Sequence, residues 1–552
     1  MNGLMMDRPL LLKALLWRAE RVFGEKEIVT KTDQGLHRYT YKDYAVRVRR
    51  LASTLEQLDV RQGDRVGTIA WNTYRHFEAY FAIPCMGAVL HTINLRLFPE
   101  QIAWIINHAG DTVLLVDPDQ LPLVERIRPE IPGVRTIIVL SDQVPDTSLN
   151  SIHGYEELLA QSSPDYDFPE FDENIAAGMC YTSATTGDPK GVVYSQRSTV
   201  LHSLALCLHN SFGVREEMTL LPAVPMFHVN SWGLPHAAAM QGTTLVLPGA
   251  RPVPQVLAEL IEQEQVTHAV GAVTVGIQLR EFLETSPRTY DLSSLKVLWL
   301  GGQSPPRGLM EWWEQRYGAY VPQAWGMTEA SPLATYTHVK ERFHEIGREA
   351  VYEVRTSQGF ALPLVEIKVA DPEGNELPWD GKSVGEFMLR TPWVASAYYN
   401  DPERTKVGFL NGWFRTGDVG TINPDGYVRL VDRTKDLIKS GGEWISSVDL
   451  ENTLMAHPQV VEAAVIATPH PKWLERPLAY VVPKNREAPP SHEDLTAFLA
   501  ARFPKWWLPD EYIFIDELPK TGVGKFDKKR LRSQLRRSEE IGSHGDIIDD
   551  TQ

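Results

Sequence analysis

Apolar runs alternate with amphipathic helical patterns along the first 300 residues of the chain, and this alternation restricts the possible folds more than any other feature. Residues 44–58, for example, repeat apolar side chains at helical spacing. Apolar strands separated by amphipathic helices predict parallel sheets covered by helices on both faces. Ligands of such sheets bind beyond the carboxyl ends of the strands. The predicted strands are residues 65–70, 112–116, 242–247, 266–270 and 295–300.

The pattern changes beyond residue 360, where short strands and frequent turns follow one another. Asn, Asp, Gly and Pro gather at 371–375, 411–412 and 423–426, and these residue types favour tight turns. We therefore predict a compact, partly antiparallel subdomain over about residues 360–431.

The C-terminal part of the chain has the pattern of a small domain. A predicted helix at 447–457 and predicted strands at 461–467 and 478–482 follow the polar stretch DRTKD. A chain of 552 residues is also too long for a single core. We predict a large N-terminal domain, a hinge linker, a small C-terminal α+β domain and a disordered acidic tail, at residues 1–431, 432–437, 438–537 and 538–552 respectively.

Net charge and cysteine usage limit the partners of the protein. The formal net charge is -16, which argues against nucleic acids and acidic membrane surfaces as partners. Cys85, Cys180 and Cys207 form no C-x-x-C pair, which is typical of a reducing compartment and excludes a cysteine zinc site. Buried thiols are a sufficient explanation for all three.

The apolar run near the N-terminus resembles the core of a signal peptide, but charges interrupt it. Lys13 stands within the run, and Arg18, Glu20 and Arg21 follow it without a small-residue cleavage site. An amphipathic surface helix is the better interpretation. No stretch has the roughly 18 uncharged apolar residues of a membrane span. We expect a soluble, cytoplasmic protein with no integral membrane association.

Residues 181–195, YTSATTGDPKGVVYS, combine the groups that hold phosphate: glycines that free backbone N–H groups, Ser and Thr hydroxyls, and a lysine. The stretch is not a Walker A loop, because Pro189 precedes Lys190 and a strand-like segment follows in place of a helix. An ordinary hairpin turn through Thr186 and Gly187 explains the same residues equally well. Taken alone, the stretch leaves both interpretations open.

Three further stretches combine groups that could bind a nucleotide. QAWGMTE at 323–329 offers a ring for stacking, a hydroxyl and a carboxylate suited to Mg²⁺, although a lone Trp usually belongs to the core and a Thr-Glu pair often begins a helix. In GWFRTGD at 412–418, Asp418 offers two acceptors for sugar hydroxyls. In LPKTGVGKF at 518–526, Lys525 taken alone is most simply a solvated lysine.

In this order and spacing, the four stretches resemble the adenylate-forming superfamily of acyl-CoA synthetases, firefly luciferase and peptide-synthetase adenylation domains. The resemblance covers essentially the whole chain. The stretch LIKSGGEWIS at 437–446 is most similar to medium- and long-chain fatty acyl-CoA ligases and to methylthiopropionyl-CoA ligases. The resemblance implies a mixed α/β fold with a large domain of parallel sheets and flanking helices, a small β-barrel-like subdomain, and a small mobile C-terminal α+β domain.

The activity that the resemblance implies is ATP-dependent acid:CoA ligation. A carboxylic acid and ATP form an acyl-adenylate and pyrophosphate, and CoA then displaces AMP to give a thioester. We expect a fatty or short aliphatic acid as substrate, together with ATP, Mg²⁺ and CoA, and a homodimer as the family assembly. Two alternatives stay open: an adenylating ligase that uses an amine or carrier thiol as acceptor, and a catalytically impaired nucleotide-binding homologue.

The resemblance assigns the loop at 182–187 and Lys190 to the β- and γ-phosphates of ATP. Glu329 and Thr182 would hold the Mg²⁺, and Thr328 would contact the α-phosphate. The other residues that it places around the phosphates and the adenine are Ser183, Ala184, Thr185, Thr186, Gly187, Gly302, Gln303, Ser304, Gln323, Ala324, Trp325, Gly326, Lys439 and Trp444.

The ribose, the catalytic lysine and the hinge are assigned in the same way. Asp418, helped by Arg433, would bind the ribose. Lys525 would reach from the small domain to the α-phosphate and the substrate carboxylate, where charge develops in the transition state. Lys435 matches the hinge about which the small domain rotates before CoA binds. The pantetheine of CoA would then pass along Ser440, Gly441, Gly442 and Glu443.

The acyl site is the part of the sequence that is hardest to interpret. PMFHVNSWG at 225–233 matches the aromatic-histidine segment of the family beside the substrate carboxylate. We expect His228 near this carboxylate as a catalytic-site residue with Val229 in the acyl pocket. For Trp232, a gate of an acyl tunnel and plain core packing have equal weight.

Two positions depart from the pattern of the family. Ala184 stands where Gly is usual, and Ala324-Trp325 stands where Gly-Tyr is usual. If residue 184 needs positive φ or close approach to a phosphate, the added methyl group weakens ATP binding. Trp325 keeps an aromatic face for stacking.

Overall fold

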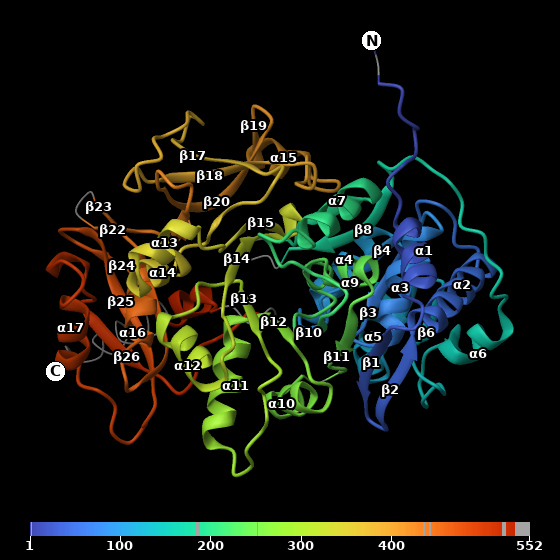
Figure 1. Cartoon of the computed structure of the whole chain (residues 1–552), viewed down its shortest axis with the longest axis horizontal. Helices are drawn as coiled ribbons and strands as arrows, with labels where there is room; N and C mark the ends of the chain where they lie inside the picture. Colours follow the sequence, from blue (N-terminus) through green and yellow to red (C-terminus); the bar gives the residue numbers. More distant parts are fainter. Residues whose placement is uncertain are drawn as a thin grey trace, which may run out of the picture.

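The computed structural model describes residues 1, 3–182, 188–250, 252–433, 436–440, 443–521 and 526–535, and the side chains at 443 and 444 are outside this description. The predicted tail at 538–552 therefore lies outside the described residues. The described strands form four sheets, and Figure 1 shows the helices packed along them.

The first of the two large sheets has nine strands. Its six central strands are parallel, and antiparallel strands flank them at both edges. In spatial order the strands are β16 (Phe360–Ala361), β15 (Leu333–Tyr336), β14 (Gln323–Gly326), β13 (Val297–Gly301), β12 (His268–Ala272), β10 (Thr219–Pro222), β11 (Thr244–Leu247), β1 (Glu27–Thr32) and β2 (Gly35–Thr40).

The second large sheet has seven strands and is parallel except for its last pair. Together the two sheets contain all five predicted strands, with ends that differ by a few residues, so the prediction of parallel sheets is confirmed. In spatial order the strands are β7 (Ile152–Gly154), β6 (Thr136–Val139), β5 (Asp111–Val116), β3 (Arg65–Ile69), β4 (Val89–Thr92), β8 (Ala176–Tyr181) and β9 (Gly191–Ser195).

Helices cover these sheets through apolar faces. In α2, Thr40 and Asp43 form a capping box at the start, and the side chains of Tyr44, Val48 and Leu51 are buried. The helices of this part are α1 (Leu12–Val22), α2 (Tyr41–Gln57), α3 (Tyr74–Cys85), α4 (Pro99–Ala109), α5 (Leu121–Ile127), α6 (Tyr155–Gln161), α7 (Gln196–Leu206), α8 (Val229–Trp232), α9 (Leu234–Gln241), α10 (Pro254–Gln263), α11 (Val273–Thr285), α12 (Arg307–Tyr317), α13 (Glu341–Ile346) and α14 (Arg348–Arg355).

The helix predicted at the N-terminus is α1, and it is amphipathic as expected. Leu12, Leu15 and Leu16 are buried, while Trp17 is 61% exposed. The segment before it projects from the body of the molecule in Figure 1.

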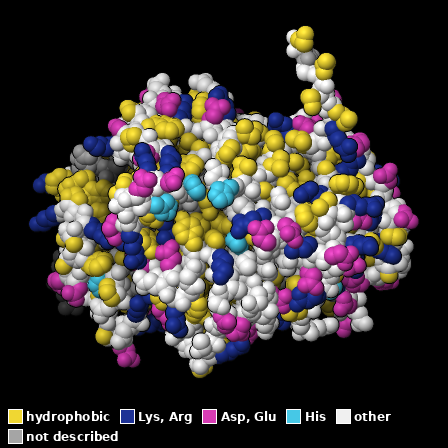
Figure 2. All heavy atoms as spheres, in the orientation of Figure 1, with side chains coloured by type: hydrophobic (Ala, Val, Ile, Leu, Met, Phe, Trp, Pro, Cys, Tyr) yellow, Lys and Arg dark blue, Asp and Glu magenta, His cyan; other side chains and the backbone are white. Residues whose placement is uncertain are grey.

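Acidic and basic side chains are interspersed over the face in Figure 2. Among the described residues, no helix is both long and apolar enough to cross a membrane.

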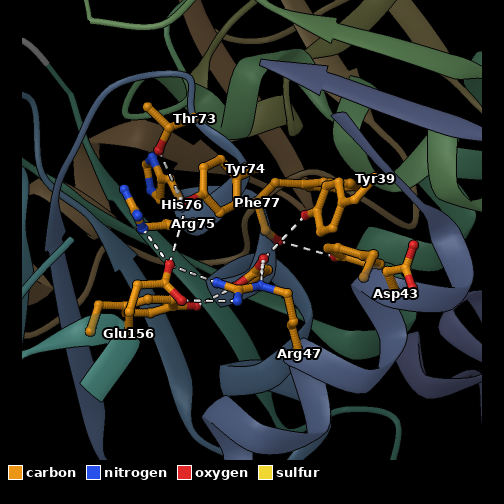
Figure 3. A network of polar contacts seen from close by, with 12 residues as sticks. Tyr39, Asp43, Arg47, Thr73, Tyr74, Arg75, His76, Phe77 and Glu156 are labelled. Atoms are coloured by element: carbon orange, nitrogen blue, oxygen red, sulfur yellow. Dashed lines mark hydrogen bonds and ion pairs between the residues drawn. The ribbon is translucent and has the colours of Figure 1, made fainter. Parts of the chain in front are cut away.

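A buried polar network joins α2, α3 and α6 (Figure 3). Arg47 Nε donates to Glu78 Oε1 at 2.7 Å, and its two terminal nitrogens donate to Glu156 at 2.9 Å each. Arg75 Nε donates to Glu156 Oε1 at 2.8 Å, and the hydroxyl of Tyr155 donates to Glu78 Oε2 at 2.5 Å. The network lies within the helical layer and lines no part of the cavity described below.

The third sheet is antiparallel, begins at residue 366 within the stretch where short strands and turns were predicted, and lies at the top in Figure 1. Asn411 and Gly412 connect two of its strands and both have positive φ, as a tight two-residue hairpin turn requires. Its elements are β17 (Glu366–Ala370), β18 (Gly385–Arg390), α15 (Pro402–Gly408), β19 (Phe409–Leu410), β20 (Trp413–Ile422) and β21 (Val428–Arg433).

The fourth sheet belongs to the C-terminal part of the chain, with its own apolar core between the sheet and two helices. The predicted helix and both predicted strands of this part are present. The elements are β22 (Ile438–Ser440), β23 (Glu443–Ile445), α16 (Ser447–Met455), β24 (Val460–His470), β25 (Leu474–Pro483), α17 (His492–Ala500) and β26 (Glu511–Phe514). The chain passes from the third sheet to the fourth between residues 433 and 438.

Candidate active site

A cavity of about 700 Å³ lies beyond the carboxyl ends of β8, β10, β12, β13 and β14. This is where the sequence predicted a ligand for sheets of this kind. The predicted site residues that line it are Thr182, Lys190, His228, Val229, Trp232, Gly302, Gln303, Ala324, Trp325, Gly326, Thr328, Glu329 and Arg433.

Other predicted residues do not line the cavity. Ser304 and Gln323 are buried beneath it, where both meet the side-chain amide of Gln358. Lys439 and Ser440 lie on β22 in the fourth sheet, and Ser440 Oγ accepts a hydrogen bond from Arg476 at 3.2 Å. The predicted residues outside the described part of the chain are Ser183, Ala184, Thr185, Thr186, Gly187, Lys435, Gly441, Gly442 and Lys525, together with the side chains of Glu443 and Trp444.

The predicted phosphate loop connects the antiparallel strands β8 and β9. Thr182 N donates to Lys190 O at 3.0 Å, and Lys190 N donates to Thr182 Oγ1 at 3.3 Å. Both residues line the cavity. The pair at the base of this connection therefore faces the cavity, whereas the residues to which the hairpin-turn and phosphate-loop interpretations apply, 183–187, lie outside the described residues.

Lys190 and Glu329 line the cavity, and Tyr398 joins them in a polar cluster. Lys190 Nζ donates to the Tyr398 hydroxyl at 2.9 Å, and this hydroxyl donates to Glu329 Oε1 at 2.8 Å. Lys190 Nζ is also 3.6 Å from Glu329 Oε1. Burial, together with the nearby Glu329 carboxylate, raises the pKa of Tyr398, so the hydroxyl stays protonated and donates. Tyr398 was not predicted, since nothing in the sequence near residue 398 indicates its partners.

Backbone contacts fix the segment that carries Thr328 and Glu329. The hydroxyl of Tyr194 donates to Thr328 O at 2.8 Å, and Ala395 N donates to Glu329 O at 2.7 Å. Gly326 precedes them, and a Cβ at this position would lie 2.0 Å from Pro332 O. Glycine is therefore required there by close packing of the backbone.

Asp418 lies behind Trp325 and is only 4% exposed. Trp325 Nε1 donates to Asp418 Oδ2 at 2.8 Å, and Arg433 Nε donates to Asp418 Oδ1 at 3.1 Å. A carboxylate has about four acceptor sites on its two oxygens, so Asp418 keeps acceptor capacity for a further donor. The tryptophan that departs from the family pattern thus orients the carboxylate predicted to bind the ribose.

Part of the cavity lining is apolar and includes Trp232. Trp232 lies against Gly301, where an added Cβ would be 2.7 Å from Trp232 Cη2. Asn72, which the sequence analysis also missed, holds the neighbouring segment: its Nδ2 donates to Pro222 O and Val224 O, and its Oδ1 accepts from Met226 N at 2.7 Å. The apolar lining includes Phe212, Ala223, Val224, Val229, Val273, Val275 and Leu333.

The C-terminal part of the chain reaches the cavity through Lys520 and Thr521. Lys520 Nζ forms an ion pair with Glu462 at 2.8 Å. The N-terminus of α16 also meets β21, since Ser446 Oγ donates to Val431 O at 2.7 Å and Ser447 N donates to an oxygen of Asp432 at 3.3 Å. Lys525, which is predicted to reach the site, follows Thr521 by four residues and lies outside the described part of the chain.

The donors in the polar wall suit Mg²⁺. Mg²⁺ is usually held by one or two carboxylates together with substrate phosphates and water. Glu329 lines the cavity with its carboxylate, and the hydroxyl of Thr182 lies in the same wall. No cluster of three or more His, Cys, Asp and Glu side chains able to hold a metal occurs among the described residues.

Sequence comparison identifies the family. Residues 16–399 match the AMP-binding enzyme family, and residues 449–525 match the AMP-binding enzyme C-terminal domain. The chain belongs to the AMP-binding enzyme family. Its structure is similar to that of an anthranilate CoA ligase in complex with anthranoyl-AMP. The TM-score is 0.86, and the identity is 25%, over 97% of this chain and 99% of that one.

Two relatives of this AMP-binding enzyme are more similar in sequence. A long-chain-fatty-acid–CoA ligase of Thermus thermophilus is 48% identical over 96% of this chain and 97% of its own. A 3-methylmercaptopropionyl-CoA ligase of Ruegeria lacuscaerulensis is 42% identical over 97% of this chain and 99% of its own. The resemblance inferred from the sequence motifs is confirmed.

Proposed function

We propose that the protein is an ATP-dependent acid:CoA ligase that adenylates an aliphatic carboxylic acid and transfers the acyl group to CoA. The observation that carries this proposal is one cavity lined both by the charged side chains of Lys190 and Glu329, which Tyr398 bridges, and by apolar side chains that include Trp232. Thr328 and His228 also line this cavity. A carboxylate with an apolar chain and a triphosphate therefore meet in one space.

In the adenylation step the carboxylate oxygen attacks the α-phosphorus and pyrophosphate leaves. This chemistry depends on in-line positioning and on neutralising negative charge. Lys190 supplies positive charge to the departing phosphates, and Tyr398 orients the Glu329 carboxylate. Mg²⁺ held by Glu329 and Thr182 would neutralise phosphate charge. Lys525 is proposed to stabilise the α-phosphate and the carboxylate in the transition state.

The proposed acid has an apolar chain. The cavity lining includes Val, Leu, Phe and Ala side chains as well as Trp232, and an apolar pocket favours aliphatic chains over polar ones. The named substrates of the two relatives, a long-chain fatty acid and 3-methylmercaptopropionate, both fit this description. We propose that His228 lies near the carboxylate and that Trp232 gates the space for the chain.

The second step requires the small domain to turn away so that CoA can approach. We propose the domain boundaries predicted above, with the hinge at Lys435, in the stretch where the chain leaves the third sheet for the fourth. Pantetheine would then pass along Ser440, Gly441, Gly442 and Glu443. We also propose a cytoplasmic location, because cysteine usage is typical of a reducing compartment, and a homodimer, because this is the assembly expected from the family.

The test is product analysis over a panel of acids from propionate and 3-methylmercaptopropionate to straight chains of increasing length. Each acid is incubated with ATP and Mg²⁺, with and without CoA, and with glycine amide as a competing amine acceptor. The proposal predicts acid-dependent AMP and a thioester only when CoA is present. Thioester formation should be lost in Lys525→Ala. An amide in place of a thioester would instead support the alternative acceptor.

A further inference from the structure

The wall of the acyl end contains a left-handed turn of the backbone. Val229, Asn230, Ser231 and Trp232 have φ values of 45, 52, 49 and 57°, and Gly233 follows with φ 76°. Ser231 N donates to His228 O at 3.1 Å, and Gly233 N donates to Asn230 O at 3.0 Å. These bonds link residues three apart, so α8 is a left-handed helical turn.

Such a turn is unfavourable for residues that carry a Cβ. Left-handed φ occurs mainly at Gly, with Asn next, and a β-branched residue such as Val229 rarely adopts it. Strained backbone of this kind persists only where surrounding contacts fix it, and it concentrates at ligand sites. The turn therefore needs anchors outside its own backbone.

Two buried polar side chains supply these anchors, and they come from the middle of the turn. Ser231 is fully buried, and its Oγ donates to Val224 O at 2.8 Å. Asn230 is 8% exposed, and its Oδ1 accepts from Thr92 Oγ1 at 3.3 Å and from Cys180 Sγ at 3.5 Å. Thr92 and Cys180 belong to β4 and β8 of the seven-stranded sheet, whereas Val224 follows β10 of the nine-stranded sheet. The turn is thus tied to both sheets.

The two ends of the turn face the cavity, and its anchors do not. Val229 and Trp232 line the cavity, but Asn230 and Ser231 do not line it. At the far end, a Cβ on Gly233 would lie 2.7 Å from Nδ1 of the buried His202, whose Nε2 accepts from Leu333 N at 3.2 Å. The left-handed conformation therefore determines where Trp232 lies.

We propose that Asn230 and Ser231 are positioning residues that set which acid the site accepts, by holding residues 229–233 left-handed and so keeping Trp232 seated against Gly301. With the turn anchored, the indole closes the apolar end. With the turn released toward ordinary backbone, the indole leaves Gly301 and longer chains gain access. This inference rests on the proposed ligase function.

The test compares Asn230→Ala with Asn230→Gly. Both lose the amide anchors, but Ala disfavours positive φ whereas Gly adopts it without cost. The measured quantity is the ratio of kcat/KM for the longest and shortest straight-chain acids that the wild-type protein adenylates. We expect Asn230→Ala to shift this ratio about tenfold toward the longer acid and Asn230→Gly to stay within about twofold of wild type. The KM for ATP should be unchanged in both.

Ser231→Ala and Ser231→Gly form a second matched pair, which decides the question if the Asn230 variants do not fold. If Ser231 serves stability alone, Ser231→Gly should shift the kcat/KM ratio of long to short acids as much as Ser231→Ala or more. That result would overturn the proposal. An unchanged ratio in both Ala variants would also overturn it. Wild-type protein that adenylates no acid at all would refute the proposed function instead, so the two failures are distinct.

Discussion

Two glutamates of this protein have the same kinds of partner in different surroundings. Glu78 accepts hydrogen bonds from the Tyr155 hydroxyl at 2.5 Å and from Arg47 Nε at 2.7 Å. Glu329 accepts from the Tyr398 hydroxyl at 2.8 Å and lies 3.6 Å from Lys190 Nζ. Each glutamate thus has a phenol and a cation among its partners.

The two clusters differ in how accessible the glutamate carboxylate is. The side chain of Glu78 is 0% exposed, and Tyr39 donates to it as a further partner. Burial raises the pKa of the Glu78 carboxyl, while Arg47 lowers it. The side chain of Glu329 is 10% exposed and lines the cavity. A carboxylate with all its partners in place joins helices, whereas one that faces a cavity is available to a cation and its phosphate ligand.

The largest expected effect is a loss of stability when the buried cluster around Glu78 is broken. Arg47→Ala leaves Glu78 buried without its cation, which should lower the free energy of the first unfolding transition in urea by about 3–5 kcal/mol. Adenylation per folded molecule should be unchanged. Arg61→Ala is the control, because Arg61 pairs with Asp59 on the surface and should cost less than about 1 kcal/mol. Equal losses in the two variants would contradict the role given to the network.

The second prediction concerns the cluster around Glu329 beside the cavity. Glu329→Gln retains an acceptor for Tyr398 but removes the charge that faces the cavity, so the adenylation rate at saturating ATP should fall about 100- to 1000-fold. The unfolding transition should stay where it is in the wild-type protein. A variant that is equally active would remove Glu329 from the proposed mechanism.

Two tyrosines provide a matched pair for the third prediction. Tyr155→Phe removes a buried hydrogen bond to a carboxylate and should cost about 1–3 kcal/mol of stability with little change in activity. Tyr398→Phe should lower kcat/KM for ATP about tenfold with little change in stability, because Glu329 and Lys190 lose the hydroxyl between them. Urea unfolding and steady-state kinetics on both variants test this. Equal effects of the two substitutions on stability and on kinetics would contradict the comparison.

The smallest effect is expected at the apolar end. A Cβ at Gly301 would lie 2.7 Å from the edge of the Trp232 ring. Gly301→Ala should therefore displace the indole and change the relative kcat/KM of short and long acids about threefold, with the KM for ATP unchanged. Gly308→Ala is the control, since nothing lies within 4 Å of a Cβ there. An altered KM for ATP would show that the two ends of the cavity are not independent.

The sequence predicts the sheets well because their strands are apolar runs with a local signal. The predicted strands at 65–70 and 112–116 appear as neighbouring parallel strands. Lys190 and Glu329 were found because each lies within a motif whose own residues are close together in the chain. Tyr398 was not, because its contacts are to residues 69 and 208 positions away. Its function depends on tertiary packing that no local pattern records.

The left-handed turn could not be predicted for a related reason. Residues 229–232 contain no glycine, and their propensities favour ordinary backbone. Partners on two different sheets hold Asn230 and Ser231 in that conformation. Likewise, the hydrogen bond from the Trp325 indole N–H to Asp418 was not predicted, and the stacking face of Trp325 stays a prediction. Such roles follow from neighbours distant in sequence.

The central claim is that the cluster around Glu329 activates a carboxylic acid with ATP. The most direct measurement is acid-dependent exchange of labelled pyrophosphate into ATP without CoA, in the wild-type protein, Glu329→Gln and Arg47→Ala. The account predicts exchange in the wild-type protein, exchange per folded molecule close to wild type in Arg47→Ala, and a loss of about 100-fold or more in Glu329→Gln. Exchange in Glu329→Gln equal to that of the wild-type protein, or no exchange with any acid in the wild-type protein, would contradict it.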